Sequence, residues 1–154
     1  MKEAEQIRYV TRNRKAWHDY TILNRLEAGI ELKGAEVKSI REGKVNLSDA
    51  HAVVEGGQVF LKNLHISPYK MATDAEQDPL RTRRLLLHKR EIRKLFVQTE
   101  QKGMTLIPLA IYFKGNLAKV ELALAVGRKK YDKRQAIAEA EANRNIKKAL
   151  RKDY

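Results

Sequence analysis

The chain has 154 residues, with 32 Lys and Arg against 19 Asp and Glu, a formal net charge of +13 and a pI near 10.0. This length suits one domain with an appendage, and so large a basic excess favours nucleic acid as a partner over charge that serves only solubility. The absence of cysteine excludes disulfides and thiolate metal sites, and no apolar run approaches the roughly twenty residues that span a bilayer, so we expect a cytoplasmic protein without a membrane partner.

Two elements are expected in the first third of the chain. Apolar and polar residues alternate after residue 19 and predict a strand, with Tyr20, Ile22 and Leu26 on one face. The segment between the breakers Gly34 and Gly43 has apolar residues three apart, which predicts a short helix.

The middle of the chain predicts a hairpin, a loop and a long helix. Gly56 and Gly57 separate two β-branched or aromatic runs and accept the positive φ angles of a tight turn. The polar segment 70–77 predicts a loop. Asp78 and Pro79 then provide a cap and a first helical residue, so we expect a helix over about 79–101.

On that helix, a rotation of about 100° per residue leaves Leu86 and Leu87 off the main apolar face. They either cover other parts of the body, which is the commoner fate of leucine, or one of them contacts a partner. The main face itself consists of Leu85, Ile92, Leu95 and Phe96.

A second hairpin is expected from segments 105–113 and 117–126. The second of these places Val120, Leu122, Leu124 and Val126 on a core face and its alanines and charged residues on the other. Antiparallel hairpins with one long helix between them favour a mainly β protein with flanking helices, namely an antiparallel Greek-key barrel of the oligonucleotide-binding (OB-fold) class. A β-sandwich and an α+β sheet remain possible.

His18 and Asp19 are the pair that invites a catalytic interpretation, since imidazole beside a carboxylate can serve RNA cleavage. Neighbours on a strand point to opposite faces, so these two residues need not cooperate. The other histidines lack metal-ligand spacing. We therefore expect no enzyme, no cofactor and no metal.

Two groups of basic residues could hold RNA phosphates, although a solvated charged surface is the usual alternative. One group crowds the start of the expected long helix, and the other flanks the short helix. They are Arg81, Arg83 and Arg84, and Lys33, Lys38, Arg41 and Lys44.

Residues 127–154 form a basic, alanine-rich tail with ten Lys and Arg against four Asp and Glu. Its alanines favour helix, but Ile137, Ile146 and Leu150 make too sparse an apolar stripe to dock it on the body. We expect the tail to be disordered when free and to fold against a polyanion.

Four motifs resemble the SsrA-binding proteins, or small protein B, of bacterial trans-translation: NRKAWHDY (13–20), EAGIELKGAEVKSIREGKVNLSDA (27–50), DPLRTRRLLLHKREI (78–92) and GRKKYDKR (127–134). The resemblance implies an RNA-binding barrel over 1–126 that holds the tRNA-like domain of transfer-messenger RNA and delivers it to stalled ribosomes. It implies that Asn13, Glu27 and Leu86 contact this RNA, with the basic residues near the short helix as secondary electrostatic contacts. Leu86 thereby changes from an expected core residue to an expected contact.

The same resemblance implies that the tail becomes helical in the messenger channel of the small subunit, beside the decoding centre. The matching residues are Gly127, Arg128, Lys129, Lys130, Tyr131, Asp132, Lys133 and Arg134. It further implies a monomer that meets elongation factor Tu with GTP, and alanyl-tRNA synthetase, through the RNA. The rival interpretations are a general RNA chaperone or ribosome-associated protein, and an RNA-processing enzyme using His18 and Asp19.

Overall fold

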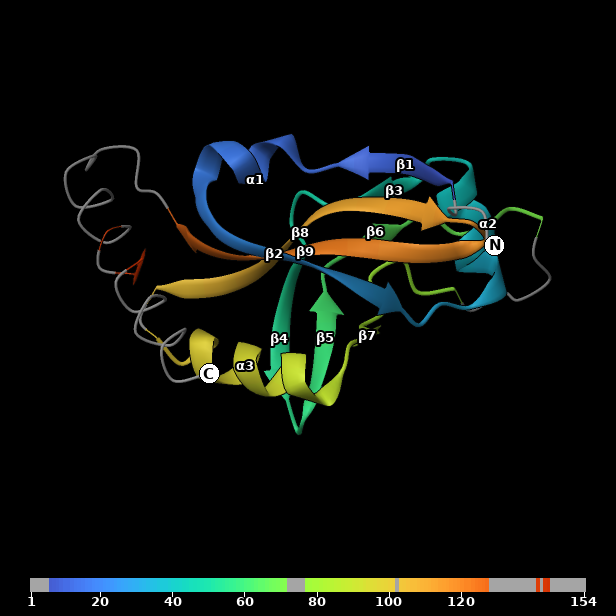
Figure 1. Cartoon of the computed structure of the whole chain (residues 1–154). Helices are drawn as coiled ribbons and strands as arrows, with labels where there is room; N and C mark the ends of the chain where they lie inside the picture. Colours follow the sequence, from blue (N-terminus) through green and yellow to red (C-terminus); the bar gives the residue numbers. More distant parts are fainter. Residues whose placement is uncertain (1–5, 72–76, 102, 128–140, 142, 145–154) are drawn as a thin grey trace.

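The computed structural model describes residues 6–71, 77–101, 103–127, 141, 143 and 144. Figure 1 shows long strands through the centre of the molecule with helices outside them. In chain order the elements are β1 (Ile7–Arg12), α1 (Arg14–Asp19), β2 (Tyr20–Ile30), α2 (Gly34–Arg41), β3 (Val45–Asn46), β4 (His51–Glu55), β5 (Gln58–Lys62), β6 (His65–Ile66), β7 (Arg83–Leu86), α3 (Lys89–Thr99), β8 (Met104–Lys114) and β9 (Leu117–Gly127).

The main sheet closes on itself. Strand β8 pairs with β4, β4 with β5, β5 with β7, β7 with β2, β2 with β9, and β9 again with β8, all antiparallel. Strand β1 adds to β8 outside this ring. Closure removes the exposed edges that would invite aggregation, and it confirms the expected barrel of the oligonucleotide-binding class with flanking helices.

Both predicted hairpins are confirmed. Gly56 and Gly57 join β4 to β5 with φ of 57° and 74°, the positive values that a tight turn of this type requires. Strands β8 and β9 pair along their whole lengths on either side of a turn at Gly115, where φ is 61°. The predicted short helix is also confirmed as α2.

The apolar residues form two clusters. The larger fills the barrel with side chains such as Leu61, Leu106 and Leu122, each 0% exposed. The smaller lies under α1 and consists of Ala16, Ile107, Leu109, Ala123 and Ala125. Ala123 and Ala125 thus lie on the face of β9 opposite to Leu122 and Leu124, as expected, and α1 covers this part of that face because the small side chains allow its close approach.

Strand β2 also differs in detail from its prediction. Tyr20 and Ile22 pack against the cluster under α1, whereas Leu26 packs against the barrel core. The register against β9 is irregular between Ile22 and Asn24, and such a bulge shifts the alternation of faces. The three residues thus lie on one strand but serve two different cores.

The long helix over 79–101 was wrong in its first half. The Asp78 carboxylate accepts the Leu80 N–H at 2.9 Å and its carbonyl accepts the Arg81 N–H at 3.2 Å, so this segment makes a turn rather than a helix start. Strand β7 follows, and its pairing with both β5 and β2 overrides the helical pattern. Helix α3 begins only at Lys89.

Strand β7, in place of a helix, decides where the leucines lie. Alternation along β7 buries Leu85, which is 2% exposed, and turns Leu86 outward, where it is 47% exposed. Leu87 is partly buried against the core. Phe96, expected on the core face, is 50% exposed, because the shorter helix packs through Leu95 and its neighbours instead.

Arg83 is the most unusual core residue, since its side chain is completely buried. Its Nε donates to Glu36 Oε2 at 2.8 Å and its Nη1 donates to the Leu64 carbonyl at 2.6 Å. Burial alone would raise the pKa of Glu36, but hydrogen bonds from Arg81, the Lys33 backbone and Arg83 outweigh it, so this pKa lies below the ordinary 4.5. The pair therefore joins α2 to β7 as a charged contact inside the fold.

We predict that Glu36→Gln lowers the free energy of unfolding by about 3 kcal/mol at neutral pH, because it leaves the buried Arg83 charge uncompensated. Because the pKa of Glu36 is lower in the folded state than in the unfolded state, ionised Glu36 stabilises the fold at pH values above its unfolded-state pKa. This stabilisation is lost as the pH falls through the folded-state pKa. The difference between the variant and the original chain should therefore shrink below the ordinary glutamate pKa of 4.5. Urea unfolding of both chains, at neutral pH and at a pH below 4.5, measures this difference.

Glu31→Gln is the matched control, because Glu31 pairs with Arg84 at 2.7 Å in a solvent-exposed position. Loss of such a pair should cost no more than about 1 kcal/mol. Equal destabilisation by both variants would contradict a special role for the buried pair.

Candidate RNA-binding surface

Strands β7, β2 and β9 bring together a set of outward residues that we call the β2 face: Glu27, Gly29, Leu86 and Lys119. Gly29 pairs with Leu86 on one side and with Lys119 on the other. Glu27 lies two residues along the same strand and so shares this face. The register therefore places two of the expected RNA contacts, Glu27 and Leu86, side by side.

Glu27 is held in place by two neighbours from β8. Its Oε2 accepts a hydrogen bond from the Tyr112 hydroxyl, and its Oε1 lies 3.6 Å from Lys114 Nζ. Burial, assisted by this hydrogen bond and the Glu27 charge, raises the pKa of Tyr112 well above its usual value, so the hydroxyl remains a donor. The carboxylate is 38% exposed and can still accept hydrogen bonds from a ligand.

Leu86 is an exposed apolar side chain whose position depends on a glycine. A Cβ at Gly29 would lie 3.1 Å from Leu86 Cβ, closer than ordinary packing allows. The glycine thus lets Leu86 lie flat beside β2 while almost half of its surface faces solvent. Lys119, which the sequence argument did not select, completes the row; its register opposite Gly29 is visible only in the folded sheet.

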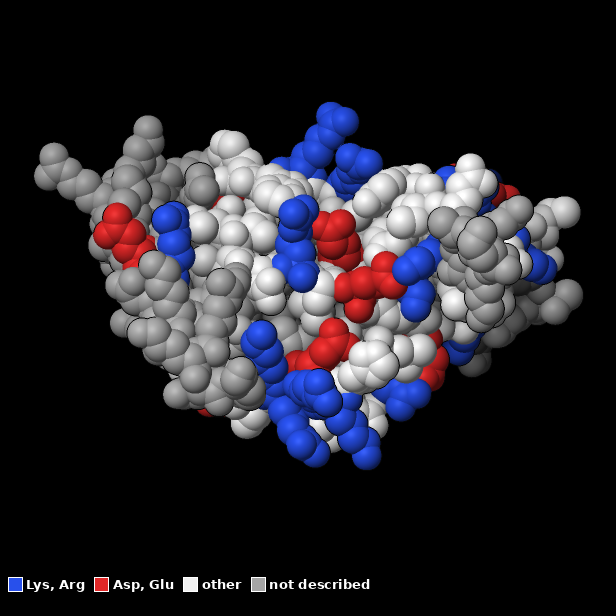
Figure 2. All heavy atoms as spheres, viewed as in Figure 1, with Lys and Arg blue, Asp and Glu red and all other residues white. Residues whose placement is uncertain are grey.

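The charge on this side of the molecule is mixed rather than uniformly positive. Figure 2 shows acidic side chains among basic ones in the middle of the view, over the region where Figure 1 draws β2 and β9. Glu27 pairs with Glu121 across these strands, and Glu121 lies 3.5 Å from Arg25. Carboxylates can read base amino groups, so such a surface can be selective rather than merely attractive.

Asn13, the third expected contact, is only 6% exposed. Its Oδ1 accepts the Ala16 N–H at 3.1 Å and caps α1, while its Nδ2 donates to the carbonyls of Pro108 at 3.0 Å and Leu47 at 3.4 Å. These contacts occupy the side chain inside the fold. Its placement argues for positioning the structure around it, not for direct contact with RNA.

The arginines of the first basic group are largely engaged by acidic residues. Arg83 is buried against Glu36, which removes it from any RNA surface. Arg81 also pairs with Glu36, and Arg84 pairs with Glu31. The sequence could not reveal this neutralisation, because these partners lie about fifty residues away.

The second basic group surrounds α2, at one end of the barrel in Figure 1. Lys38 Nζ lies 5.5 Å from the Tyr69 ring centroid, and Lys44 pairs with Glu42 at 3.2 Å. Arg41 lies over the Phe113 ring. Lys33 precedes the helix as its N-cap and is exposed. Apart from Lys44, this group keeps its charge available.

Helix α3 carries a basic surface that sequence analysis missed. Its exposed residues Lys89, Arg90, Arg93 and Lys94 form no ion pair within the described part of the chain. Figure 2 shows basic side chains gathered at the lower edge, near α3 in Figure 1. Lys89 and Arg93, like Arg90 and Lys94, are four residues apart and so share one side of the helix, a spacing that the sequence already contained.

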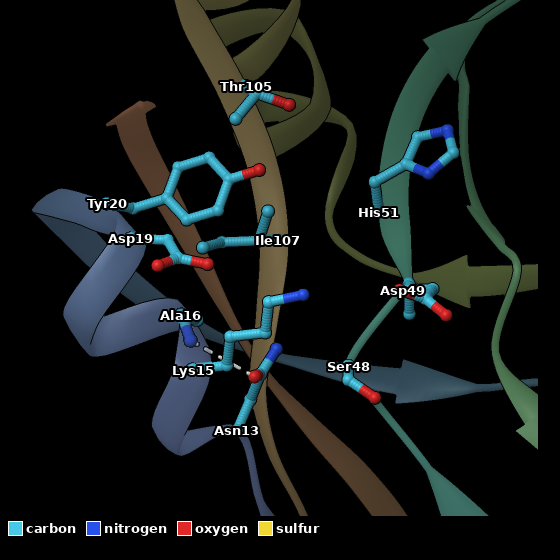
Figure 3. Close-up of a pocket in the computed structure, with 11 residues that line it drawn as sticks. Asn13, Lys15, Ala16, Asp19, Tyr20, Ser48, Asp49, His51, Thr105 and Ile107 are labelled. Atoms are coloured by element: carbon cyan, nitrogen blue, oxygen red, sulfur yellow. Dashed lines mark hydrogen bonds between the residues drawn. The ribbon is translucent and has the colours of Figure 1, made fainter. Parts of the chain in front are cut away.

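His18 and Asp19 lie at the end of α1 rather than on a strand, so the geometric argument against their cooperation was wrong. His18 Nδ1 is 3.1 Å from Asp19 Oδ1, but the His18 side chain is 76% exposed. Asp19 lines a cavity of about 360 Å³ between α1 and residues 48–51, which His18 does not line. Figure 3 places Asp19 and Tyr20 on one side of this cavity and Asp49 and His51 on the other.

Two further observations concern the described residues alone. They contain no cluster of three or more His, Cys, Asp or Glu that could hold a metal ion. None of the helices they form has both the length and the apolar character to cross a membrane.

The tail residues Arg128, Lys129, Lys130, Tyr131, Asp132, Lys133 and Arg134 and most of loop 70–77 lie outside the described residues. The start of the tail is defined, however, because Gly127 ends β9 opposite Tyr20 of β2. The tail therefore leaves the barrel beside α1, at the end of β2 remote from the β2 face.

Comparison with known proteins identifies the family. Residues 10–152 match the model described as SmpB protein. The chain is 56% identical over 147 residues to an SsrA-binding protein of Halothermothrix orenii, covering 96% of this chain and 95% of the relative. It is 57% identical over 145 residues to that of Carboxydothermus hydrogenoformans, with coverage of 94% and 97%.

A solved structure described as "tmRNA-SmpB: a journey to the center of the bacterial ribosome" contains a similar chain, with a TM-score of 0.67 and 51% identity, over 82% of this chain and 93% of that one. Relatives this similar over nearly the whole length leave one assignment. The chain belongs to the SmpB family, the SsrA-binding proteins.

Proposed function

We propose that this chain is an RNA-binding adaptor that holds the tRNA-like domain of transfer-messenger RNA and delivers it to stalled ribosomes for trans-translation. The observation that carries the proposal is identity above 50%, along nearly the whole chain, to proteins named for binding SsrA. The similar chain in a structure described by tmRNA, SmpB and the ribosome supports the same partners.

The β2 face is the part of the barrel best suited to specific recognition. Glu27, fixed by Tyr112 and Lys114, offers a carboxylate to base amino groups, and Leu86 offers an apolar contact next to it. Lys119 adds a positive charge for the backbone. The exposed basic residues of α2 and α3 then add attraction that depends on salt rather than sequence.

The tail provides the second half of the proposed function. In this proposal residues 127–154 act as a basic segment that folds as a helix in the messenger channel of the small subunit, with Tyr131 and Asp132, Lys133 and Arg134 beside the decoding centre. Its excess of basic residues supports an RNA-lined destination. The tail begins at Gly127, away from the β2 face, so the barrel can hold transfer-messenger RNA while the tail contacts ribosomal RNA.

The proposed adaptor is non-enzymatic, cytoplasmic and monomeric. Elongation factor Tu with GTP and alanyl-tRNA synthetase meet it through the bound RNA. The exposure of His18 outside the neighbouring cavity disfavours an RNA-processing enzyme, because a general base must reach a held substrate. A general RNA chaperone remains the main rival function.

Competition binding separates the proposed function from this rival. We expect transfer-messenger RNA to bind at physiological salt and to resist displacement by unrelated structured RNAs at equal concentration. Displacement by those RNAs would support the general chaperone and contradict a dedicated RNA partner.

The β2 face predicts the effect of two substitutions. Leu86→Ala and Glu27→Gln should each weaken binding of transfer-messenger RNA by about tenfold, in the range of central contact residues, while unfolding stability stays close to that of the original chain. Filter binding and urea unfolding measure the two quantities. Leu117→Ala is the control, because Leu117 is 61% exposed at the β8–β9 turn and should change neither.

Removal of the tail should separate RNA binding from action on the ribosome. A chain ending at Val126 should bind transfer-messenger RNA within a few-fold of the full chain and fail to support tagging in a translation reaction on messenger without a stop codon. Loss of RNA affinity by orders of magnitude would contradict the division of roles between barrel and tail.

A further inference from the structure

A cavity of about 390 Å³ lies where β1, the end of α2 and the β8–β9 turn meet. None of its lining residues belongs to the β2 face. The residues that matter for its chemistry are Arg8, Arg41, Phe113, Gln6, Gly115 and Asn116. Segments distant in sequence thus build one concave site.

Two arginines converge on a single ring in this cavity. The guanidinium carbons of Arg8 and Arg41 each lie 5.5 Å from the centroid of Phe113, so they are within 11 Å of each other. The ring is 2% exposed and fixed in the barrel. Stacking on an aromatic face orients a guanidinium while its N–H groups remain free to donate.

Within the part of the chain that the structure describes, no carboxylate neutralises the positive charge of the arginines in this cavity. Its described lining residues include no carboxylate, and neither Arg8 nor Arg41 has an ion-pair partner among the residues placed by the structure. The neighbouring Glu42 pairs with Lys44. Arg81, Arg83 and Arg84 show the opposite arrangement, since Glu31 and Glu36 neutralise them.

The end of α2 does not cancel this charge. Free carbonyls at a helix C-terminus repel anions, but here the Lys38, Ser39 and Ile40 carbonyls accept N–H groups from residues 42–44. The amides of Gln6 and Asn116, which also line the cavity, add neutral donors. Gly115, in the turn between β8 and β9, also lines the cavity.

We propose that this cavity binds one phosphate group of an RNA backbone, held between Arg8 and Arg41, as a contact separate from the β2 face. Guanidinium groups match phosphate geometry, with two parallel N–H donors to two oxygens. The RNA source of the phosphate rests on the proposed function. One phosphate bridging β1 and α2 would fix how the RNA lies across this end of the barrel.

The test measures the affinity of the full chain for transfer-messenger RNA at salt concentrations between about 50 and 200 mM. Affinity falls as salt rises, and each phosphate contact contributes a factor of about three to this fall, so a variant that loses one contact should show a fall about threefold smaller. The double variant Arg8→Gln/Arg41→Gln should bind more weakly at low salt and show this flatter dependence. Arg41→Lys, which keeps the charge but not the paired donors, should keep the slope and lose affinity a few-fold. Circular dichroism and unfolding midpoints check that each variant folds.

Lys62→Gln is the matched control, since it removes one positive charge from a surface pair with Glu55 on the opposite strand. Its salt slope should equal that of the original chain. A double variant with an unchanged slope overturns the proposal.

Inorganic phosphate distinguishes the source of the anion. Titration of the full chain, followed by the Nε resonances of Arg8 and Arg41, should show shifts that RNA abolishes. Shifts with phosphate alone and an unchanged RNA slope would mean a free-phosphate site and overturn the RNA contact. If the original chain fails to bind transfer-messenger RNA, the proposed function fails, and the same slopes measured on ribosomal RNA decide the cavity separately.

Discussion

The barrel depends on strand β8, because one edge of this strand pairs with two different strands along its length. It pairs with β9 from Met104 to Lys114 on one edge, while on the other it meets β4 at Leu106 and β1 from Ala110 onward. Asn13 fills the interval: its N–H donates to the Leu109 carbonyl at 2.7 Å and its side chain to that of Pro108. Buried carbonyls would otherwise lack donors at this junction. One amide residue thus links the barrel, the added strand and the start of α1.

Basic residues of this chain divide into two kinds according to long-range contacts. Those of β7 face Glu31 and Glu36 and stabilise the fold, most clearly Arg83. Those of α2, α3 and β1 keep their charge at the surface. The net charge of +13 therefore overstates the positive charge that β7 can offer to RNA and understates how strongly this charge is concentrated on α2, α3 and β1.

Local chemistry predicted those parts of the fold whose geometry is decided locally. The adjacent glycines Gly56 and Gly57 allowed the first hairpin to be predicted, and alternation along 117–126 beside the apolar segment 105–113 did the same for β8 and β9. The segment around Leu85 failed because a run of leucines suits helix or strand equally, and pairing with β5 and β2 decides between them. Leu86 was expected at the surface only through family resemblance; its exposure arises from strand alternation, and its contact with RNA stays a prediction. The burial of Asn13 and Arg83 depends on partners remote in sequence, which no local pattern contains.

Strand β2 connects the two ends of the proposed activity. Tyr20 at its beginning pairs with Gly127, from which the tail departs, and Glu27 lies seven residues further along. At a rise of about 3.3 Å per residue, these points are about 23 Å apart, a spacing set by a hydrogen-bonded strand within a closed barrel. The length of β2 therefore fixes the distance between the start of the tail and Glu27. Deletion of one residue within the strand would shorten this distance and would also turn Glu27 from solvent toward the core. Changes of length in β2 should therefore be far less tolerable than changes of side chain on its surface.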